Sequence, residues 1–140
     1  MPAGAMRLAE INSADWSLEL DSTAGAGPGS GLGNVVQGLD DVAQCVAIIL
    51  TTPPGSDPLR PTFACDLWQF LDAPLSRVLP KIVAAVTSAL QTWEPRIKVL
   101  GVTAAPVAAN PGQVEVSVTW QLDLGETPAP APRVTTASVG

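Results

Sequence analysis

Residues Leu50 to Trp68 read L-T-T-P-P-G-S-D-P-L-R-P-T-F-A-C-D-L-W, and the rest of the chain is arranged around them. Four prolines interrupt this stretch: Pro53, Pro54, Pro58 and Pro61. Each fixes its own φ and drives the preceding residue toward extended geometry, so neither a helix nor a central strand can run through. We therefore predict a stiff connection between the apolar run Val42–Leu50 and the aromatic pair Trp68 and Phe70.

Length and composition favour one soluble domain. A chain of 140 residues suits a single core, and no apolar run approaches the ~20 residues of a membrane helix. Seven basic and thirteen acidic residues leave a net charge of −6, and the basic residues are scattered. Phosphate binding needs clustered cations, so we expect no nucleic acid and no membrane as partners.

Three further features of the sequence concern export, the cysteines and a Gly-rich run. The first residues, M-P-A-G-A-M-R, lack the continuous apolar core of an export signal. Two cysteines fit a reducing cytoplasm, and we expect Cys45 to be buried and inert. The Gly-rich run at 24–33 lacks the ending of a phosphate loop and is interpreted as a flexible loop.

Two elements are predicted before the connection. Alternation over Trp16–Asp21 predicts a strand with Trp16, Leu18 and Leu20 on one face. From Asp40 the period changes to that of a helix, which Asp40 or Asp41 can cap and which ends at Thr51 or Thr52 before the two prolines. Its apolar stripe comprises Val42, Cys45, Val46, Ile49 and Leu50.

Two helices are predicted after it. The first is short, Asp66–Leu71, capped by Asp66 and turning Leu67, Phe70 and Leu71 inward. The second runs from Ser76 to Trp93, with Pro80 in its first turn and Pro95 forcing its end. Its buried stripe comprises Ile82, Val83, Val86, Leu90 and Trp93.

The last part of the chain predicts a β-hairpin and a tail. Arg96–Ala105 is a strand with a bulge at Gly101, residues 110–112 are a turn, and Val114–Leu122 alternates without error. The second strand should be buried on one face. From 125 to 140 there is no apolar period, and the Pro-Ala alternation predicts an extended or disordered, mobile tail.

Residue inventory restricts catalysis. The chain has no histidine, which excludes Ser-His and Cys-His nucleophiles and nearly every ordinary zinc site, and we expect no cofactor and no metal. A glycosidase needs paired carboxylic acids, for which Asp57, Asp66 and Glu94 are the candidates. Each has a simpler structural role as turn former, helix cap or ion-pair partner, so we expect no enzyme.

The segment Trp93-Glu94-Pro95-Arg96 is the most specific polar feature. Residues two apart in an extended chain face the same side, so Glu94 and Arg96 can form a forked, charge-assisted pair. The pair joins either two parts of this chain or this chain and another. Arg60, confined by Pro58 and Pro61, points outward or against Glu94.

Two motifs in order carry a resemblance. A helix ending in I-L-T-T precedes P-G-x-x-x-x-R-P-x-F-x-x-D-L-W, and a later helix runs into W-E-P-R-I at Trp93–Ile97. Over about Gly38 to Leu122 the chain resembles the phage baseplate assembly protein W family, the baseplate wedge or sheath-initiator proteins of contractile tails and type VI secretion baseplates. Where that family commonly has glycine after the motif's Phe, this chain has Ala64, which argues against a left-handed backbone there.

The resemblance implies an architecture and a setting. The fold would be α+β, a small antiparallel sheet packed against two main helices. It would comprise an N-terminal extension at 1–10, a wedge domain at 11–124 and the tail at 125–140. Implied partners are baseplate wedge proteins, tail sheath protein, and central hub or spike proteins. The implied location is the virion tail baseplate, with the host cytoplasm during assembly.

The resemblance also implies interface residues. The family's Glu-Pro-Arg turn is thought to mediate baseplate contacts, and it matches Glu94, Pro95 and Arg96 here. Arg60 is a further candidate. An open sheet edge accepts a partner's strand, and the strand Val114–Leu122 motivates the hypothesis that one edge of this sheet receives strands from sheath protein. The candidate residues of that strand are Val114, Val116, Val118 and Trp120.

Two alternatives stay open. Some members of the family carry a lysozyme label, so a peptidoglycan-degrading muramidase of the tail is the competing class. An adaptor in a type VI or other contractile injection system differs from the first hypothesis by context alone.

Overall fold

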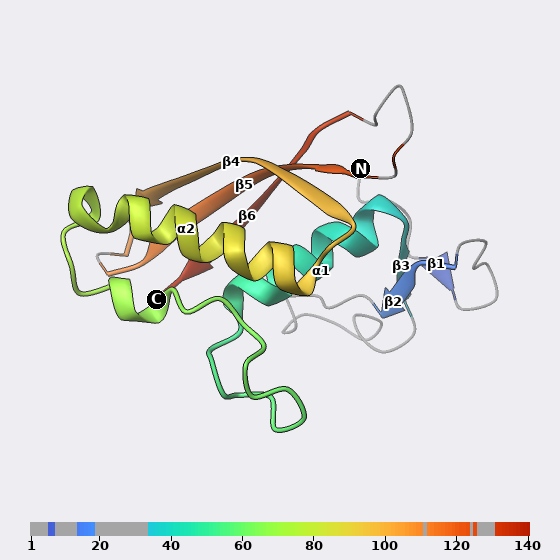
Figure 1. Cartoon of the computed structure of the whole chain (residues 1–140), viewed down its shortest axis with the longest axis horizontal. Helices are drawn as coiled ribbons and strands as arrows, with labels where there is room; N and C mark the ends of the chain where they lie inside the picture. Colours follow the sequence, from blue (N-terminus) through green and yellow to red (C-terminus); the bar gives the residue numbers. More distant parts are fainter. Residues whose placement is uncertain (1–5, 8–13, 19–33, 111, 124, 126–130) are drawn as a thin grey trace. The chain divides into compact units, whose positions relative to one another are not determined.

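The computed structural model describes residues 6–7, 14–18, 34–110, 112–123, 125 and 131–140 (Figure 1). These residues form two α-helices, a short 3-10 helix and two three-stranded antiparallel sheets. The predicted α+β class, with small antiparallel sheets and two main helices, is confirmed. Contacts divide the chain into two compact units, Met1–Cys45 and Val46–Gly140, with the boundary inside the first helix.

The first unit contains the smaller sheet. Its strands are β1 (Met6–Arg7), β2 (Trp16–Leu18) and β3 (Asn34–Gln37), in the spatial order β1-β3-β2. The strand predicted at Trp16–Asp21 is present over its described residues, and its exposed Trp16 and Leu18 share one face. The expected loop at 24–33 lies outside the described residues.

Helix α1 (Leu39–Thr51) follows β3 directly and matches its prediction. Gly38 makes the junction at φ +58°, a left-handed value that suits glycine, and its N–H donates to Asp15 O at 3.0 Å. The predicted stripe is buried at Val42, Val46, Ile49 and Leu50. Cys45 is half-buried instead, and the expectation of a fully buried thiol there is wrong, because its helix position lies at the edge of the stripe.

The C-terminal end of α1 shows how the proline-rich connection returns to the helix. Thr51 and Thr52 donate their hydroxyls to the carbonyls of Ala47 and Ile48. The N–H of Cys65 then donates to Ile49 O at 3.1 Å. The last carbonyls of a helix have no partner within it, so this bond satisfies one of them and fixes the far end of the connection.

Helix α2 (Leu75–Trp93) supplies more buried residues to the core of the second unit than any other single element. It begins at Leu75 with Pro74 as its N-cap, one residue earlier than predicted, so Pro80 lies in the second turn rather than the first. The residues of this unit that are buried, at most 9% exposed, are Val46, Ile49, Leu50, Phe63, Cys65, Leu67, Val78, Ile82, Val86, Ala89, Leu90, Ile97, Val116, Val118, Trp120, Ala137 and Val139. Neither of the described helices has the length and apolarity to cross a membrane.

The second sheet has the order β4-β5-β6 and contacts α2 through β4 (Ile97–Pro106), as Figure 1 shows. The hairpin of β4 and β5 (Val114–Leu122) and the bulge next to Gly101 were both predicted and are confirmed. One face of β5 is buried at Val116, Val118 and Trp120.

The tail departs from its prediction. Arg133–Val139 form β6, paired antiparallel with β5 over seven residue pairs from Val114–Val139 to Trp120–Arg133. The expectation of a mobile arm is therefore wrong for these residues. Thr135, Ala137 and Val139 are buried, and Trp120 Nε1 donates to Thr135 Oγ1 at 2.9 Å. The sequence pattern did not predict this strand because its inward positions are Thr, Ala and Val, which give only a weak alternation of apolar and polar residues.

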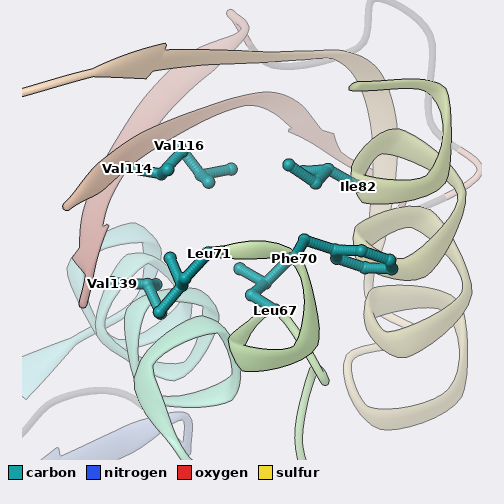
Figure 2. Close-up of a pocket in the computed structure, with 7 residues that line it drawn as sticks. All are labelled: Leu67, Phe70, Leu71, Ile82, Val114, Val116 and Val139. Atoms are coloured by element: carbon teal, nitrogen blue, oxygen red, sulfur yellow. The ribbon is translucent and has the colours of Figure 1, made fainter. Parts of the chain in front are cut away.

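A 3-10 helix, η2 (Trp68–Phe70), closes one end of the core. Asp66 does not cap it: Leu67 is the N-cap and makes no side-chain capping bond, so that prediction is wrong. Figure 2 shows side chains from η2, α2, β5 and β6 around an apolar cavity of about 10 Å³. Its lining comprises Leu67, Phe70, Leu71, Ile82, Val114, Val116 and Val139. This volume is near the limit for one water molecule, so the cavity is a packing gap rather than a ligand site.

Candidate functional site

The Glu-Pro-Arg corner lies where α2 turns into β4. The backbone of Glu94 leaves helical geometry at φ −131° and ψ 71°, and its N–H donates to Leu90 O at 2.8 Å as the last bond of the helix. Pro95 prevents continuation, and the chain enters β4 at Ile97. The carbonyl of Arg96 accepts the N–H of Asp123 at 2.8 Å, which attaches the corner to the far end of β5.

Glu94 and Arg96 pair within this chain. Arg96 Nε lies 2.6 Å from Glu94 Oε1, and Nη2 lies 2.9 Å from Oε2, which is the forked geometry expected from the sequence. The Glu94 side chain is 5% exposed and that of Arg96 is 35% exposed. Arg96 thus neutralises a buried carboxylate while keeping a third of its own surface accessible beside the exposed ring of Pro95.

Of the two predicted placements of Arg60, the outward one holds: its side chain is 56% exposed, and its ion pair is with Asp57 rather than with Glu94. Its Nε donates to Asp57 Oδ2 at 3.0 Å, and its guanidinium carbon lies 4.2 Å from the ring centre of Phe63. Phe63 in turn meets Trp93 edge to face, with ring centres 5.2 Å apart at 72°. Contacts from Arg60 to Phe63 and from Phe63 to Trp93 therefore attach the connection to the end of α2. Trp93 directly precedes Glu94 in the sequence.

A polar groove of about 310 Å³ lies between the end of the connection and α2. Its lining comprises Thr62, Ala64, Cys65, Asp66, Ala85, Ser88, Ala89, Thr92 and Trp93. The sequence argued against a left-handed backbone at Ala64, and this is wrong: φ is 148° there. The hydrogen bonds of Phe63 N–H to Arg60 O and of Cys65 N–H to Ile49 O fix the chain on both sides of Ala64 and impose that value.

The structure places the candidate interface residues of β5 in the middle strand of the sheet. Val116, Val118 and Trp120 are 1%, 0% and 0% exposed, and Val114 is half-buried against the apolar cavity. Moreover β5 is the central strand, with both edges paired. These side chains are core residues because they lie on the buried face of β5, and the second edge of β5 is paired with β6, a strand that the sequence did not reveal. Among the described strands, β4 and β6 form the two edges of this sheet.

The three carboxylates that were candidates for a glycosidase site each have a different structural environment. Asp57 is held in the turn by the Leu59 N–H and by Arg60, which lower its pKa from the ordinary 3.8. Glu94 has both oxygens bonded to Arg96, and Asp66 is exposed at the groove. In the described part of the chain no three residues among His, Cys, Asp and Glu gather as a metal site.

The sequence of residues 36–126 matches the model of one protein family, described as baseplate wedge protein gp25. The chain belongs to this family. The matched range covers the connection, the Glu-Pro-Arg corner, and the hairpin of β4 and β5, and it ends before β6. No match is found among curated proteins.

Solved structures agree with membership of the gp25 family. The baseplate of pyocin R2 in its postcontracted state contains a chain with 31% identity and a TM-score of 0.52, covering 69% of this chain and 97% of that one. A protein of Geobacter sulfurreducens, provisionally described as a tail lysozyme, has 29% identity and a TM-score of 0.58 over 72% of this chain and 90% of that one. A chain of the anti-feeding prophage baseplate shares the fold at 16% identity, with a TM-score of 0.51 over 76% and 72% of the two chains.

This gp25-family chain is thus a structural component of a contractile-tail baseplate. The sequence correctly brought Glu94 and Arg96 together and set Arg60 in a stiff connection. It missed the contact of Phe63 with Trp93, thirty positions apart, because a pairing between two distant aromatic residues leaves no periodic signal.

Proposed function

We propose that the chain joins the baseplate wedge through the Glu94-Pro95-Arg96 corner and templates the first sheath ring by strand pairing at β6. The observation that carries the second part is the sheet order β4-β5-β6, in which β5 is saturated and β6 ends the sheet. Between Val134 and Val139, no backbone hydrogen bond from another described residue reaches β6 except those from β5.

The two edges of this sheet differ in how well they can accept a strand. The edge strand β4 carries Lys98, the bulge next to Gly101 and Pro106, three features by which proteins discourage strand addition. Strand β6 between Arg133 and Val139 has regular register and contains no lysine, proline or bulge. A strand added there would extend the apolar layer of Ala137 and Val139 if its own residues alternate apolar and polar.

Lysine substitution on the exposed face of β6 tests strand pairing. In Thr136→Lys/Ser138→Lys the added charges should prevent edge pairing, so that tails assemble with baseplates but without sheath, as seen by electron microscopy. The matched control is Thr103→Lys, an exposed position on β4. Normal sheath in the β6 variant, or loss of sheath in the β4 control alone, would contradict pairing at β6.

Arg96→Ala tests the corner. Removing Arg96 leaves the buried Glu94 carboxylate without its cation, and because Arg96 is one-third exposed we expect a loss of about 1–3 kcal/mol in the free energy of unfolding. The purified variant should stay folded at room temperature by circular dichroism, yet be absent from purified baseplates. Arg96→Lys, which keeps the charge without the fork, is the control. If the alanine variant is unfolded, the pair has a purely internal role.

The muramidase hypothesis rests on the description of the Geobacter sulfurreducens protein. Glycoside hydrolysis needs a protonated acid and a second carboxylate on either side of the sugar bond. Here Glu94 is 4% exposed and fully bonded to Arg96, and the turn lowers the pKa of Asp57. These features support a scaffold over a hydrolase.

A further inference from the structure

Leu59 is the most exposed large apolar side chain in the described part of the chain. It is 92% exposed, whereas the other large apolar residues on the surface are 37% to 64% exposed. A single surface leucine is ordinary and needs no explanation by itself. Leu59 differs in that a preformed turn carries it and that this turn projects outward.

Asp57 builds the turn around Leu59. Its Oδ1 accepts the Leu59 N–H at 3.0 Å, its Oδ2 accepts Arg60 Nε at 3.0 Å, and its carbonyl accepts the Arg60 N–H at 3.2 Å. Pro58, which lies between Asp57 and Leu59, has a fixed φ and so restricts the backbone of the turn. One residue upstream, Ser56 donates its hydroxyl to Pro53 O at 2.7 Å. The backbone on both sides of Leu59 is therefore held without a partner protein.

The turn is also attached to the rest of its unit. Arg60 lies over Phe63, whose N–H donates to Arg60 O at 2.9 Å, and Phe63 contacts Trp93 at the end of α2. Figure 1 shows this connection, in green, reaching away from α2 and the sheet β4-β5-β6. Leu59 is thus presented at a defined position by a turn that is attached to the end of α2 through Arg60, Phe63 and Trp93.

We propose that the turn Asp57–Arg60 is a docking element whose Leu59 side chain inserts into an apolar pocket of a neighbouring baseplate subunit, with a carboxylate of that subunit at the rim. The proposal rests on the proposed function as a baseplate component. The two terminal nitrogens of Arg60 make no hydrogen bond to any described residue and are available to a rim carboxylate. A preformed turn loses little conformational entropy on binding, so most of the gain from burying leucine remains as affinity.

The test compares Leu59→Ser, Leu59→Met and wild-type chains in cells that produce complete tails, by quantifying the chain in purified baseplates with mass spectrometry. We expect the serine variant to be reduced about tenfold or more at limiting expression, because it loses leucine burial. The methionine variant should approach wild type, since methionine fills apolar pockets adaptably. Thermal unfolding should be alike in all three, because Leu59 is 92% exposed.

A photo-crosslinking residue at position 59 identifies the contact directly. In assembled baseplates we expect it to join apolar residues of one other subunit, whereas the same group at Leu100, a half-exposed leucine on β4, should not join that subunit. Wild-type levels of the serine variant, or the absence of a cross-link at 59, would overturn docking while leaving the baseplate function intact. Absence of the wild-type chain from baseplates would overturn both.

Discussion

Cys65, not Cys45, is the chemically distinctive cysteine. Its side chain is buried, and desolvation, with a smaller effect of the Asp66 charge, raises its pKa from 9.0 to about 12. A pKa of about 12 leaves a negligible thiolate fraction at neutral pH. The thiol is therefore inert in the folded chain.

We predict that Cys65 resists alkylation by iodoacetamide at pH 8 until the protein unfolds. The pKa of the Cys65 thiol is higher in the folded chain than in the unfolded chain. Its contribution to the free energy of unfolding is therefore complete below about pH 9 and is lost as the pH rises toward 12. Denaturant unfolding at pH 8 and pH 11 should thus show a larger loss in the wild type than in Cys65→Ala. Half-buried Cys45 controls for reagent activity, and rapid labelling of native Cys65 would contradict the prediction.

Ala64 shows how a tertiary constraint overrides a local preference. An alanine at φ 148° is strained, typically by ~1–3 kcal/mol, and glycine would adopt the same value freely. The backbone accepts this value because the bonds of Phe63 and Cys65 fix both neighbours. The identity of residue 64 alone predicts the wrong backbone conformation, because the hydrogen bonds that fix its neighbours are accepted by the carbonyls of Ile49 and Arg60.

Among the elements, α1, α2, β4 and β5 are the ones that the sequence located well. Each has a long or strict apolar period, and prolines mark the ends of both helices. The limits of α2 differ by one residue from the prediction, which is enough to move Pro80 from the first turn to the second. Strand β6 was missed for the opposite reason, because Pro-Ala alternation precedes it and its apolar side is weak.

Removal of β6 should destabilise the second unit. A chain ending after residue 130 lacks the strand that covers one edge of β5 and loses the buried Ala137 and Val139 and the bond from Trp120 to Thr135. We expect a loss of more than about 3 kcal/mol in the free energy of unfolding, with aggregation through the exposed edge. Denaturant unfolding and size-exclusion chromatography measure both effects. A truncated chain as stable as the full one would mean that the tail is dispensable.

For the molecule as a whole, the surface features support a scaffold rather than a catalyst. The partly exposed Arg96 of the forked pair, the strand edge at β6 and the projecting Leu59 each suit contact with another protein chain. None of them presents a protonated acid to a small substrate.

We predict that the purified protein does not clear peptidoglycan in a zymogram. The positive control is a known muramidase in the same gel, and the matched variant is Glu94→Gln. Clearing by the wild type that the variant loses would establish hydrolysis and contradict the scaffold. The expected result is no clearing by either chain, because Arg96 and burial keep Glu94 from any substrate.

The order of residues alone was sufficient for the main helices, the hairpin with its bulge and the forked pair of Glu94 and Arg96, because each arises from near neighbours or a regular period. The α+β class came from the family resemblance of the motifs. Folding in three dimensions settled the edge strand β6, the central position of β5 in the sheet, the Phe63–Trp93 contact and the strained Ala64. These depend on which distant segments meet, and contacts between distant segments leave little trace in local sequence patterns.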